Sequence, residues 1–238
     1  MEKIYTIVTN TIDDREADRA KDVYVDSAEQ ALTYEPVPDY ARVVAELIAS
    51  AHPRRVLEFG CSAGRNLKLL EARIPNSTLV GVDVNPRAIE MGRALHGLEL
   101  TLADENWIAG QPDDAFDVSF TVSVIDHMPY PETTLRHLLR ISRKFLILFE
   151  LEHHRLGKAT HNVLFDGDSV RLQSAYRYSY IHDYRFELER KLGAHCIADL
   201  KYPIGREDLR DLYRLYVFSK DHSFGSKPAI ATITLSDL

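Results

Sequence analysis

VLEFGCSAGRNLKLL, residues 56–70, decides how this chain folds. An apolar run carries one acidic residue, Glu58, and a turn spaced by Gly60 and Gly64 follows it. Beyond the turn, a leucine-bearing segment begins. Glycine supplies the backbone conformations of tight turns and lets the backbone come close to a ligand. The stretch is therefore typical of a buried strand that turns sharply into a helix.

The same alternation of strand and helix continues along the chain. We expect strands over residues 54–60, 77–83, 98–104, 115–124, 144–152, 194–202 and 212–220, and helices over 64–73, 86–95, 131–142 and 176–192. A further helix begins after Asp39, its predicted N-cap, and ends before Pro53. Residues 104–114 are too polar and turn-rich to assign to a helix. The pattern predicts an α/β fold with a doubly wound, mostly parallel seven-stranded sheet and helices on both faces.

Composition narrows the class of protein. The chain has 238 residues and a net charge of −7, which argues against nucleic acid as a partner. Cys61 and Cys196 stand far apart without metal-ligand spacing, so we expect neither a disulfide nor a metal site. The first residues are too charged for a secretory signal, and the longest purely apolar run, 145–149, is too short to span a membrane. We expect a soluble, cytoplasmic protein.

The carboxyl ends of the strands should hold the ligand, as they do in doubly wound sheets. Asp83 follows Gly64 by about 20 residues, which suits an acid that binds ribose hydroxyls. A nicotinamide-binding glycine pattern that starts at Gly60 would need glycines where the chain has Ser62 and Arg65. Glu58 would repel a pyrophosphate, whereas it would attract a ligand that carries an ammonium and a sulfonium.

Four motifs in order resemble one family. They are EFGCSAG at 58–64, GVDVNPRAIE at 81–90, LAD ending at Asp104, and FDVSFTVSVIDHMP at 116–129. Together they resemble the class I S-adenosylmethionine-dependent methyltransferases over roughly residues 40–220. Ser62 stands where glycine is usual, and ISRKF replaces the usual Pro-Gly turn before the fifth strand. The resemblance implies a Rossmann-like methyltransferase fold whose last two strands form an antiparallel hairpin at the sheet edge.

The resemblance also implies cofactor-binding roles. Glu58 would hold the methionine ammonium, Asp83 the ribose hydroxyls, and the backbone from Ser123 to Ile125 would face the methionine moiety. The other implied cofactor residues lie in the glycine turn and beside the adenine: Gly60, Ser62, Gly64, Val84, Asp104 and Glu105. Trp107 either lies over the adenine or packs under a loop. Asp117 reads as a structural acid, and Cys61 as a small turn residue.

The acceptor site is less defined by the motifs. Three histidines follow the fourth and fifth strands and are candidates for a general base or for shaping the pocket: His127, His153 and His154. The start of the predicted helix at 176–192 would line the acceptor pocket with Tyr176, Tyr178, Tyr180 and His182. Tyr184 belongs to that helix's apolar stripe and should be core. The N-terminal segment, which carries Tyr24, would close over the cofactor.

These observations predict a methyltransferase domain over residues 39–220, a cap segment over 1–38, a lid or acceptor-site insertion over 153–182 and a tail over 221–238. The predicted reaction uses S-adenosyl-L-methionine, yields S-adenosyl-L-homocysteine, and methylates an oxygen or nitrogen of a polar small molecule. Two rivals stay open: an NAD-linked oxidoreductase, and a non-catalytic cofactor-binding or scaffold protein with the same fold. We expect neither a nucleic-acid nor a membrane partner, and leave open whether the chain acts alone or as a homodimer.

Overall fold

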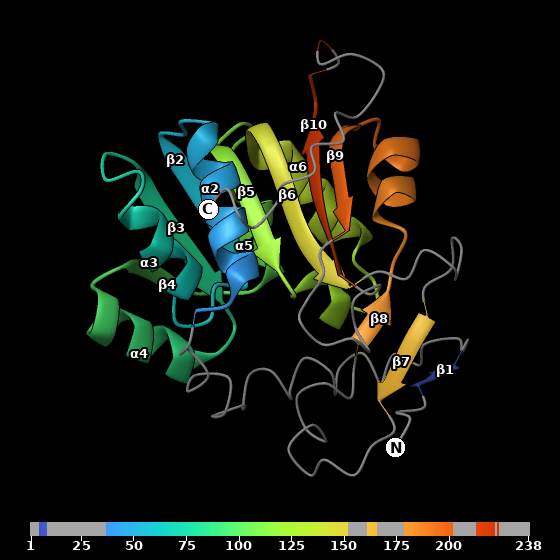
Figure 1. Cartoon of the computed structure of the whole chain (residues 1–238), viewed down its shortest axis with the longest axis horizontal. Helices are drawn as coiled ribbons and strands as arrows, with labels where there is room; N and C mark the ends of the chain where they lie inside the picture. Colours follow the sequence, from blue (N-terminus) through green and yellow to red (C-terminus); the bar gives the residue numbers. More distant parts are fainter. Residues whose placement is uncertain are drawn as a thin grey trace.

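The computed structural model describes residues 5–8, 37–151, 161–165, 179–201, 213–221 and 223 (Figure 1). Five residues predicted for the site lie outside these ranges: Tyr24, His153, His154, Tyr176 and Tyr178. Among the described residues, no helix combines the length and the apolar character needed to cross a membrane.

A seven-stranded sheet forms the centre of the structure, in the order β4-β3-β2-β5-β6-β10-β9. Its strands are β2 (Arg55–Phe59), β3 (Thr78–Asp83), β4 (Glu99–Leu102), β5 (Phe116–Val122), β6 (Ser142–Leu151), β9 (His195–Lys201) and β10 (Tyr213–Ser219). The first five of these pair in parallel, while β10 pairs antiparallel with both β6 and β9. The predicted doubly wound fold with an antiparallel edge hairpin is confirmed.

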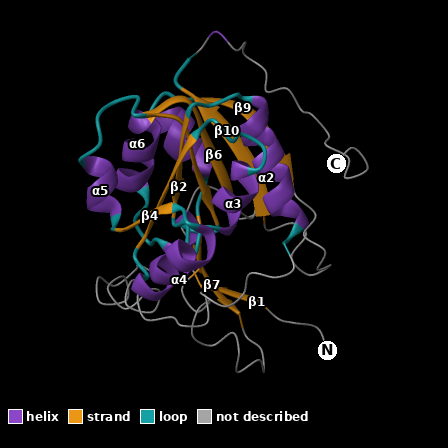
Figure 2. Ribbon diagram, turned by 90° about the vertical axis from the view of Figure 1, so that its left-hand side faces the viewer, coloured by secondary structure: helices purple, strands orange, loops and turns teal. Residues whose placement is uncertain are grey.

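Helices cover both faces of this sheet (Figure 2). On one face lie α2 (Asp39–Ser50) and α3 (Arg65–Glu71), and on the other α5 (Glu105–Ala109) and α6 (Glu132–Ile141); α4 (Pro86–His96) follows β3. The side chains of successive residues in a strand therefore point to opposite faces of the sheet and pack in different hydrophobic cores. Val56 packs with Val44 and Ile48 of α2, whereas Leu57 packs in the core that contains Leu138 of α6. Burial on both faces explains why the strands are apolar throughout.

The start of α2 differs from the prediction. Pro38, in extended conformation, occupies the N-cap position, and Asp39 is the first residue of the helix without a capping side-chain bond. A carboxylate in the first turn still interacts favourably with the positive end of the helix. The predicted apolar face is present, because Val43, Val44 and Ile48 are buried.

The helix predicted over residues 176–192 is wrong at its start. Ser179–Ile181 form strand β8, and the π-helix η3 spans only Phe186–Lys191. Alternating aromatic residues favour a strand, and here the strand tendency wins over the helical spacing. Tyr184 and Leu188 are buried as the apolar stripe predicts.

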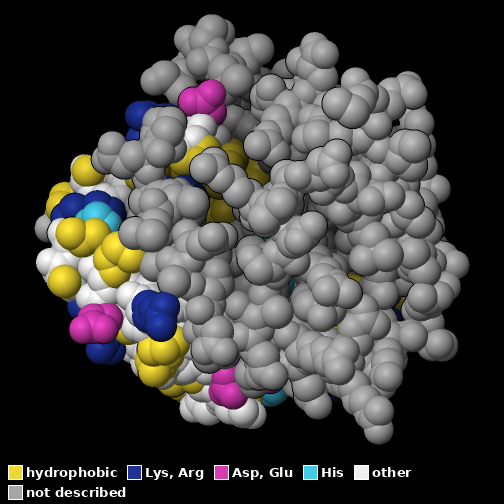
Figure 3. Space-filling model, turned by 90° about the horizontal axis from the view of Figure 1, so that it is seen from below, with side chains coloured by type: hydrophobic (Ala, Val, Ile, Leu, Met, Phe, Trp, Pro, Cys, Tyr) yellow, Lys and Arg dark blue, Asp and Glu magenta, His cyan; other side chains and the backbone are white. Residues whose placement is uncertain are grey.

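A second, three-stranded sheet has the order β1-β7-β8. Strand β1 (Tyr5–Val8) pairs antiparallel with β7 (His161–Phe165), and β7 pairs antiparallel with β8. The small sheet lies beyond the carboxyl ends of the parallel strands (Figure 1), and β8 contacts the short helix Ile125–His127 that follows β5. The N-terminal segment thus meets the insertion after β6 at the edge where the site is expected. Seen from below the view of Figure 1, the described part of the surface carries acidic, basic and hydrophobic side chains that are interspersed (Figure 3).

Candidate functional site

The turn after β2 holds three residues in the left-handed backbone region. Gly60, Ser62 and Gly64 have φ angles of 76°, 49° and 82°. A Cβ atom on Gly60 would lie 2.3 Å from Cγ2 of Val124, so only glycine fits there. A Cβ on Gly64 would lie 2.8 Å from Cδ1 of Leu98, so that glycine makes room for the core. The left-handed φ of Ser62 explains why glycine is usual at its position.

Asp83 ends β3 next to this turn. Its Oδ2 accepts a hydrogen bond of 2.7 Å from the backbone N–H of Ser62, and its Oδ1 accepts one of 2.8 Å from that of Asn85. Burial raises the pKa of Asp83 above its ordinary value, while these two amides act in the opposite direction. The half-buried carboxyl group therefore both fixes the turn and borders the strand ends.

Glu58 lies inside β2 with a side chain that is 1% exposed. Its Oε1 accepts a hydrogen bond of 2.6 Å from Nδ2 of Asn66, whereas its Oε2 has no hydrogen-bond partner among the described residues. Burial raises the pKa of Glu58 to about 8, and the nearby Arg65 lowers it only in part. A buried carboxyl oxygen without a donor is costly, so this site favours a ligand that brings a donor or a positive charge.

The predicted adenine side of the site follows β4. Strands β3 and β4 end together, because Asp83 and Leu102 are partners in their parallel register. Asp104 then caps α5 by accepting a hydrogen bond of 3.0 Å from the N–H of Asn106, and Glu105 lies in the first helical turn. Trp107 packs with Phe116, at 6.4 Å between ring centroids, which supports its reading as a residue under a loop.

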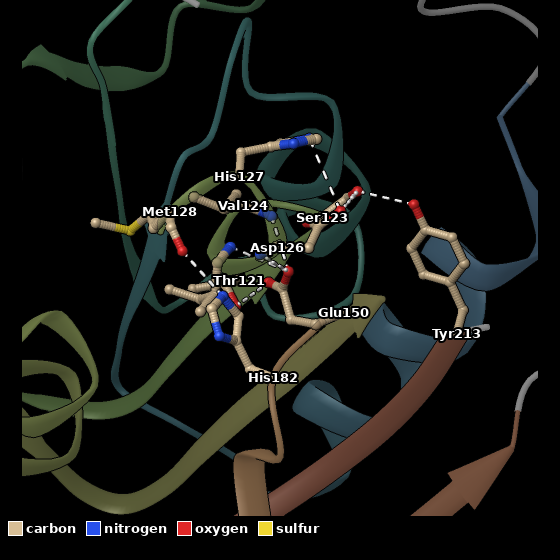
Figure 4. A network of polar contacts seen from close by, with 10 residues as sticks. Thr121, Ser123, Val124, Asp126, His127, Met128, Glu150, His182 and Tyr213 are labelled. Carbon is tan, nitrogen blue, oxygen red and sulfur yellow. Dashed lines mark hydrogen bonds and ion pairs between the residues drawn. The ribbon is translucent and has the colours of Figure 1, made fainter. Parts of the chain in front are cut away.

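The turn after β5 completes the edge (Figure 4). Ser123 has a φ of 54°, and its hydroxyl lies 3.0 Å from the hydroxyl of Tyr213 on β10. Oε2 of Glu150 accepts the backbone N–H groups of Val124, Ile125 and Asp126 at 2.9, 3.0 and 3.2 Å. Sequence reasoning missed Glu150 and Tyr213. An acid at the end of a buried apolar strand was the available signal for Glu150.

The described histidines differ in their surroundings. His127 ends the short 3-10 helix η2 (Ile125–His127), with a 12% exposed side chain and its Nε2 3.9 Å from Oδ2 of Asp126. His182 is 2% exposed, its Nε2 lies 2.9 Å from the carbonyl oxygen of Met128, and burial lowers its pKa to about 4. Tyr180 is buried as well. Because Tyr180 and His182 are buried, a role in supporting the turn after β5 is favoured over direct contact with an acceptor.

The structure thus brings together Glu58, Gly60, Ser62, Asp83 and the turn at 123–127, which come from three adjacent strands. Residues 57–144, which include all of these, match the family model described as a methyltransferase domain. Trans-aconitate 2-methyltransferase of Methylobacterium radiotolerans is 30% identical over 128 residues, which are 52% of this chain and 48% of that protein. Residues 57–144 thus form a methyltransferase domain, as the family resemblance of the motifs predicts.

A second relative of this chain is trans-aconitate 2-methyltransferase of Methylobacterium nodulans, which is 32% identical over 103 residues. These residues are 42% of this chain and 39% of that protein. The matched part therefore spans about half, or less, of the length of these two curated relatives.

Solved structures share the methyltransferase fold at low identity. The 1,6-didemethyltoxoflavin-N1-methyltransferase of Burkholderia thailandensis, solved with S-adenosylhomocysteine, has a TM-score of 0.63 and 14% identity, covering 91% of this chain and 95% of its own. The plantazolicin methyltransferase BpumL, also solved with S-adenosylhomocysteine, has a TM-score of 0.59 and 15% identity, covering 87% and 99%. The [4+2]-cyclase SpnF has a TM-score of 0.54 and 18% identity, covering 76% and 81%. The fold alone thus hosts more than one reaction.

Proposed function

We propose that this chain transfers a methyl group from S-adenosyl-L-methionine to an oxygen or nitrogen atom of a polar small molecule and releases S-adenosyl-L-homocysteine. One observation carries the proposal: the buried Glu58 carboxyl group, one oxygen of which has no hydrogen-bond partner among the described residues, lies beside the glycine turn that is tied to Asp83. When bound, the cofactor supplies an electrophilic methyl group on its sulfonium.

Different residues at the strand ends bind different parts of the cofactor. Glu58 binds the ammonium group of the cofactor, and Asp83 accepts hydrogen bonds from the ribose hydroxyls. Gly60 lets the backbone come close, while Ser62 and Gly64 shape the same turn. The remaining cofactor contacts come from Val84, Asp104 and Glu105 around the adenine and from Ser123 beside the methionine moiety.

The acceptor must lie in line with the sulfonium, on the side of the turn after β5. The curated relatives are trans-aconitate methyltransferases, and trans-aconitate offers carboxylate oxygens. The toxoflavin methyltransferase methylates a nitrogen. An ionised carboxylate needs no base, whereas a hydroxyl or a protonated amine must lose a proton. Among the described residues His127 is our candidate for this base, and His153 and His154 are candidates from the sequence alone. Tyr24, Tyr176 and Tyr178 are candidates from the sequence for contacts with the acceptor.

We also propose that residues 1–38 and 153–182 form a cap and a lid over the domain at 39–220, followed by a tail at 221–238. The pairing of β1 with β7 supports this arrangement, because it joins the two segments at the carboxyl ends of the parallel strands (Figure 1). A cap there would exclude water from the sulfonium.

Two rival functions predict different ligands. An NAD-linked oxidoreductase would have to place a pyrophosphate near Glu58. The buried carboxyl group of Glu58 favours a cation over an anion, and this argues against the oxidoreductase. A non-methylating protein with the same fold has a precedent in the [4+2]-cyclase SpnF. That rival predicts cofactor binding without methyl transfer.

Calorimetry with S-adenosylmethionine, S-adenosylhomocysteine and NAD tests the cofactor. We expect the first two to bind and NAD not to bind. Binding of NAD alone would overturn the proposal. Turnover with trans-aconitate and with a library of carboxylic acids, phenols and amines, read as release of S-adenosylhomocysteine, then tests methyl transfer. Cofactor binding without turnover of any acceptor class would favour the non-methylating rival.

Single replacements of His127, His153 and His154 by Gln test the base. For an acceptor that must lose a proton, the true base should lower kcat by about a hundredfold while S-adenosylhomocysteine affinity stays near that of the wild type. Near-full kcat in all three variants would exclude a histidine base. The reaction would then rest on alignment of a neutral amine or an ionised oxygen.

A further inference from the structure

Two buried carboxyl groups lie behind the turn after β5. Glu150, at the end of β6, is 0% exposed and Asp126, in η2, is 1% exposed. Glu150 accepts the three backbone N–H groups of residues 124–126 on Oε2 and the hydroxyl of Thr121 on Oε1 at 2.5 Å. Oδ1 of Asp126, whose own N–H is one of the three that Glu150 accepts, is buried and has no hydrogen-bond partner among the described residues. A hydrogen bond between the two carboxyl groups would satisfy this oxygen, and it requires that one of them carries a proton.

Among the described residues, the charged and titratable groups around the pair do not offset two negative charges. Nε2 of His127 lies 3.9 Å from Oδ2 of Asp126, and His182 is held neutral by burial, which lowers its pKa to about 4. Arg214 is the β10 partner of Glu150 in register, but its guanidinium pairs with Asp199 at 2.6 Å. Two ionised carboxylates on residues this near to each other and out of water would repel each other strongly.

The pair reaches the cofactor turn through Val124. Glu150 holds the N–H of Val124 at 2.9 Å, and the side chain of Val124 lies where a Cβ on Gly60 would have to go. Asp126 adds a contact to the same turn, since the hydroxyl of Ser123 lies 3.4 Å from its Oδ2. The position of the turn at 123–127 therefore depends on the acid behind it (Figure 4).

We propose that Glu150 is a positioning residue: it shares one proton with Asp126, and the hydrogen-bonded pair holds the turn from Ser123 to His127 against the Gly60 turn. Only the link to cofactor binding rests on the proposed function; the shared proton does not. Burial and the neighbouring Asp126 raise the pKa of Glu150 well above its ordinary value, which is the direction that a shared proton requires.

The shared proton is tested by the pH dependence of stability. In the unfolded chain both acids are ionised above about pH 5, whereas the folded pair keeps one proton. The stabilising contribution is therefore complete at low pH and is lost as the pH rises. We expect the urea midpoint of the wild type to fall, relative to that of Glu150→Gln, as the pH rises from about 5 to 8. Glu58 and Asp83 titrate in both proteins and cancel. Parallel curves would overturn the shared proton.

The positioning role is tested by calorimetry with S-adenosylhomocysteine. Glu150→Gln keeps an oxygen for the three amides and should bind like the wild type. Glu150→Asp keeps the acid but withdraws it by one methylene, so affinity should fall by about tenfold. Asp117→Asn is the matched control, because Asp117 accepts the N–H groups of Arg54 and Arg55 at the other end of β5. Its affinity should not change.

Each outcome decides one part. If Glu150→Gln and Glu150→Asp, both folded, lose affinity equally, the charge of Glu150 matters and its placement of the turn does not. If both bind like the wild type, Glu150 does not position the cofactor turn. If the wild type itself does not bind S-adenosylhomocysteine, the proposed function fails, and the pH dependence alone decides whether the pair shares a proton.

Discussion

The backbone N–H of Ser62 donates a hydrogen bond of 2.7 Å to Oδ2 of Asp83, which ties the turn after β2 to the end of β3. The carboxyl group that should bind ribose is thus the same group that fixes the glycine turn. A change at Asp83 acts on both halves of the proposed cofactor site. This coupling makes Asp83 the first position to test.

Asp83→Ala should weaken S-adenosylhomocysteine binding by roughly tenfold to a hundredfold, because charge-assisted hydrogen bonds of about 1.5–3 kcal/mol are lost. Asp83→Asn retains one acceptor oxygen and should fall between the wild type and Asp83→Ala. Isothermal calorimetry measures the affinity, and circular dichroism checks that the variants fold. A folded Asp83→Ala that binds like the wild type would remove Asp83 from the site.

Gly60→Ala should abolish cofactor binding and destabilise the fold, since the new Cβ would lie 2.3 Å from Cγ2 of Val124. Gly97→Ala is the matched control: Gly97 also has a positive φ, of 65°, but a Cβ there meets nothing within 4 Å. The control should lose only the strain of the left-handed conformation, about 1 kcal/mol. Denaturant unfolding and calorimetry of both variants measure the difference. Equal losses would show that conformation, and not space, requires glycine at position 60.

Glu58 should make stability and affinity depend on pH in opposite ways. Its folded pKa of about 8 lies above the ordinary value of 4.5, so its contribution to stability is present at low pH and is lost as the pH rises through about 8. Glu58→Gln should therefore gain stability relative to the wild type by about 1.4 kcal/mol per pH unit within that window. Unfolding curves between pH 5 and 9 measure this.

Cofactor affinity should rise with pH in the wild type, because an ammonium ligand favours the ionised form of Glu58 and releases its proton. Calorimetry of S-adenosylhomocysteine binding in two buffers with different ionisation enthalpies counts that proton. Glu58→Gln should bind more weakly and release none. Proton release unchanged by the substitution would mean that another group meets the ammonium.

His182 should make the fold less stable in acid, because its buried site favours the neutral form of the side chain. Its folded pKa of about 4 lies below the ordinary 6.5, so its contribution is present above pH 6.5 and is lost as the pH falls through about 4. His182→Gln can keep the hydrogen bond to the carbonyl oxygen of Met128 and carries no titratable group. The wild type should lose about 1.4 kcal/mol per pH unit relative to this variant in that range. Identical acid unfolding of the two proteins would contradict the buried neutral histidine.

The main sheet could be predicted because its strands are buried on both faces. Val56 and Leu57 enter different cores, so the strand reads as a continuous apolar run that no surface strand would show. The small sheet could not be predicted. Strand β8 has only three residues, and its partner β7 comes from a separate part of the chain, so local patterns there carried little information.

The candidate site also has one part that could be predicted from the sequence and one part that could not. The turn at Gly60 and the acid at Asp83 follow from spacing along one βαβ unit, which the sequence displays directly. The role of Glu150 depends on β6 lying beside β5, which brings its carboxyl group under a turn 24 to 26 residues earlier in the chain. Tyr213 meets Ser123 across 90 residues, through the antiparallel pairing of β10. Such contacts arise from tertiary register and leave no local pattern.

Strand β10 is the last of the seven along the sequence, yet it lies between β6 and β9. During synthesis on the ribosome, the five parallel strands can therefore assemble while one side of β6 still exposes unpaired backbone groups. Strand β9, which pairs only with β10 in the described sheet, has to wait for residues 213–219 to leave the exit tunnel. Such an open edge recruits other chains. The yield of folded protein in a cell should therefore depend on how soon residues 213–219 are released and on whether a chaperone covers the open edge of β6 until then.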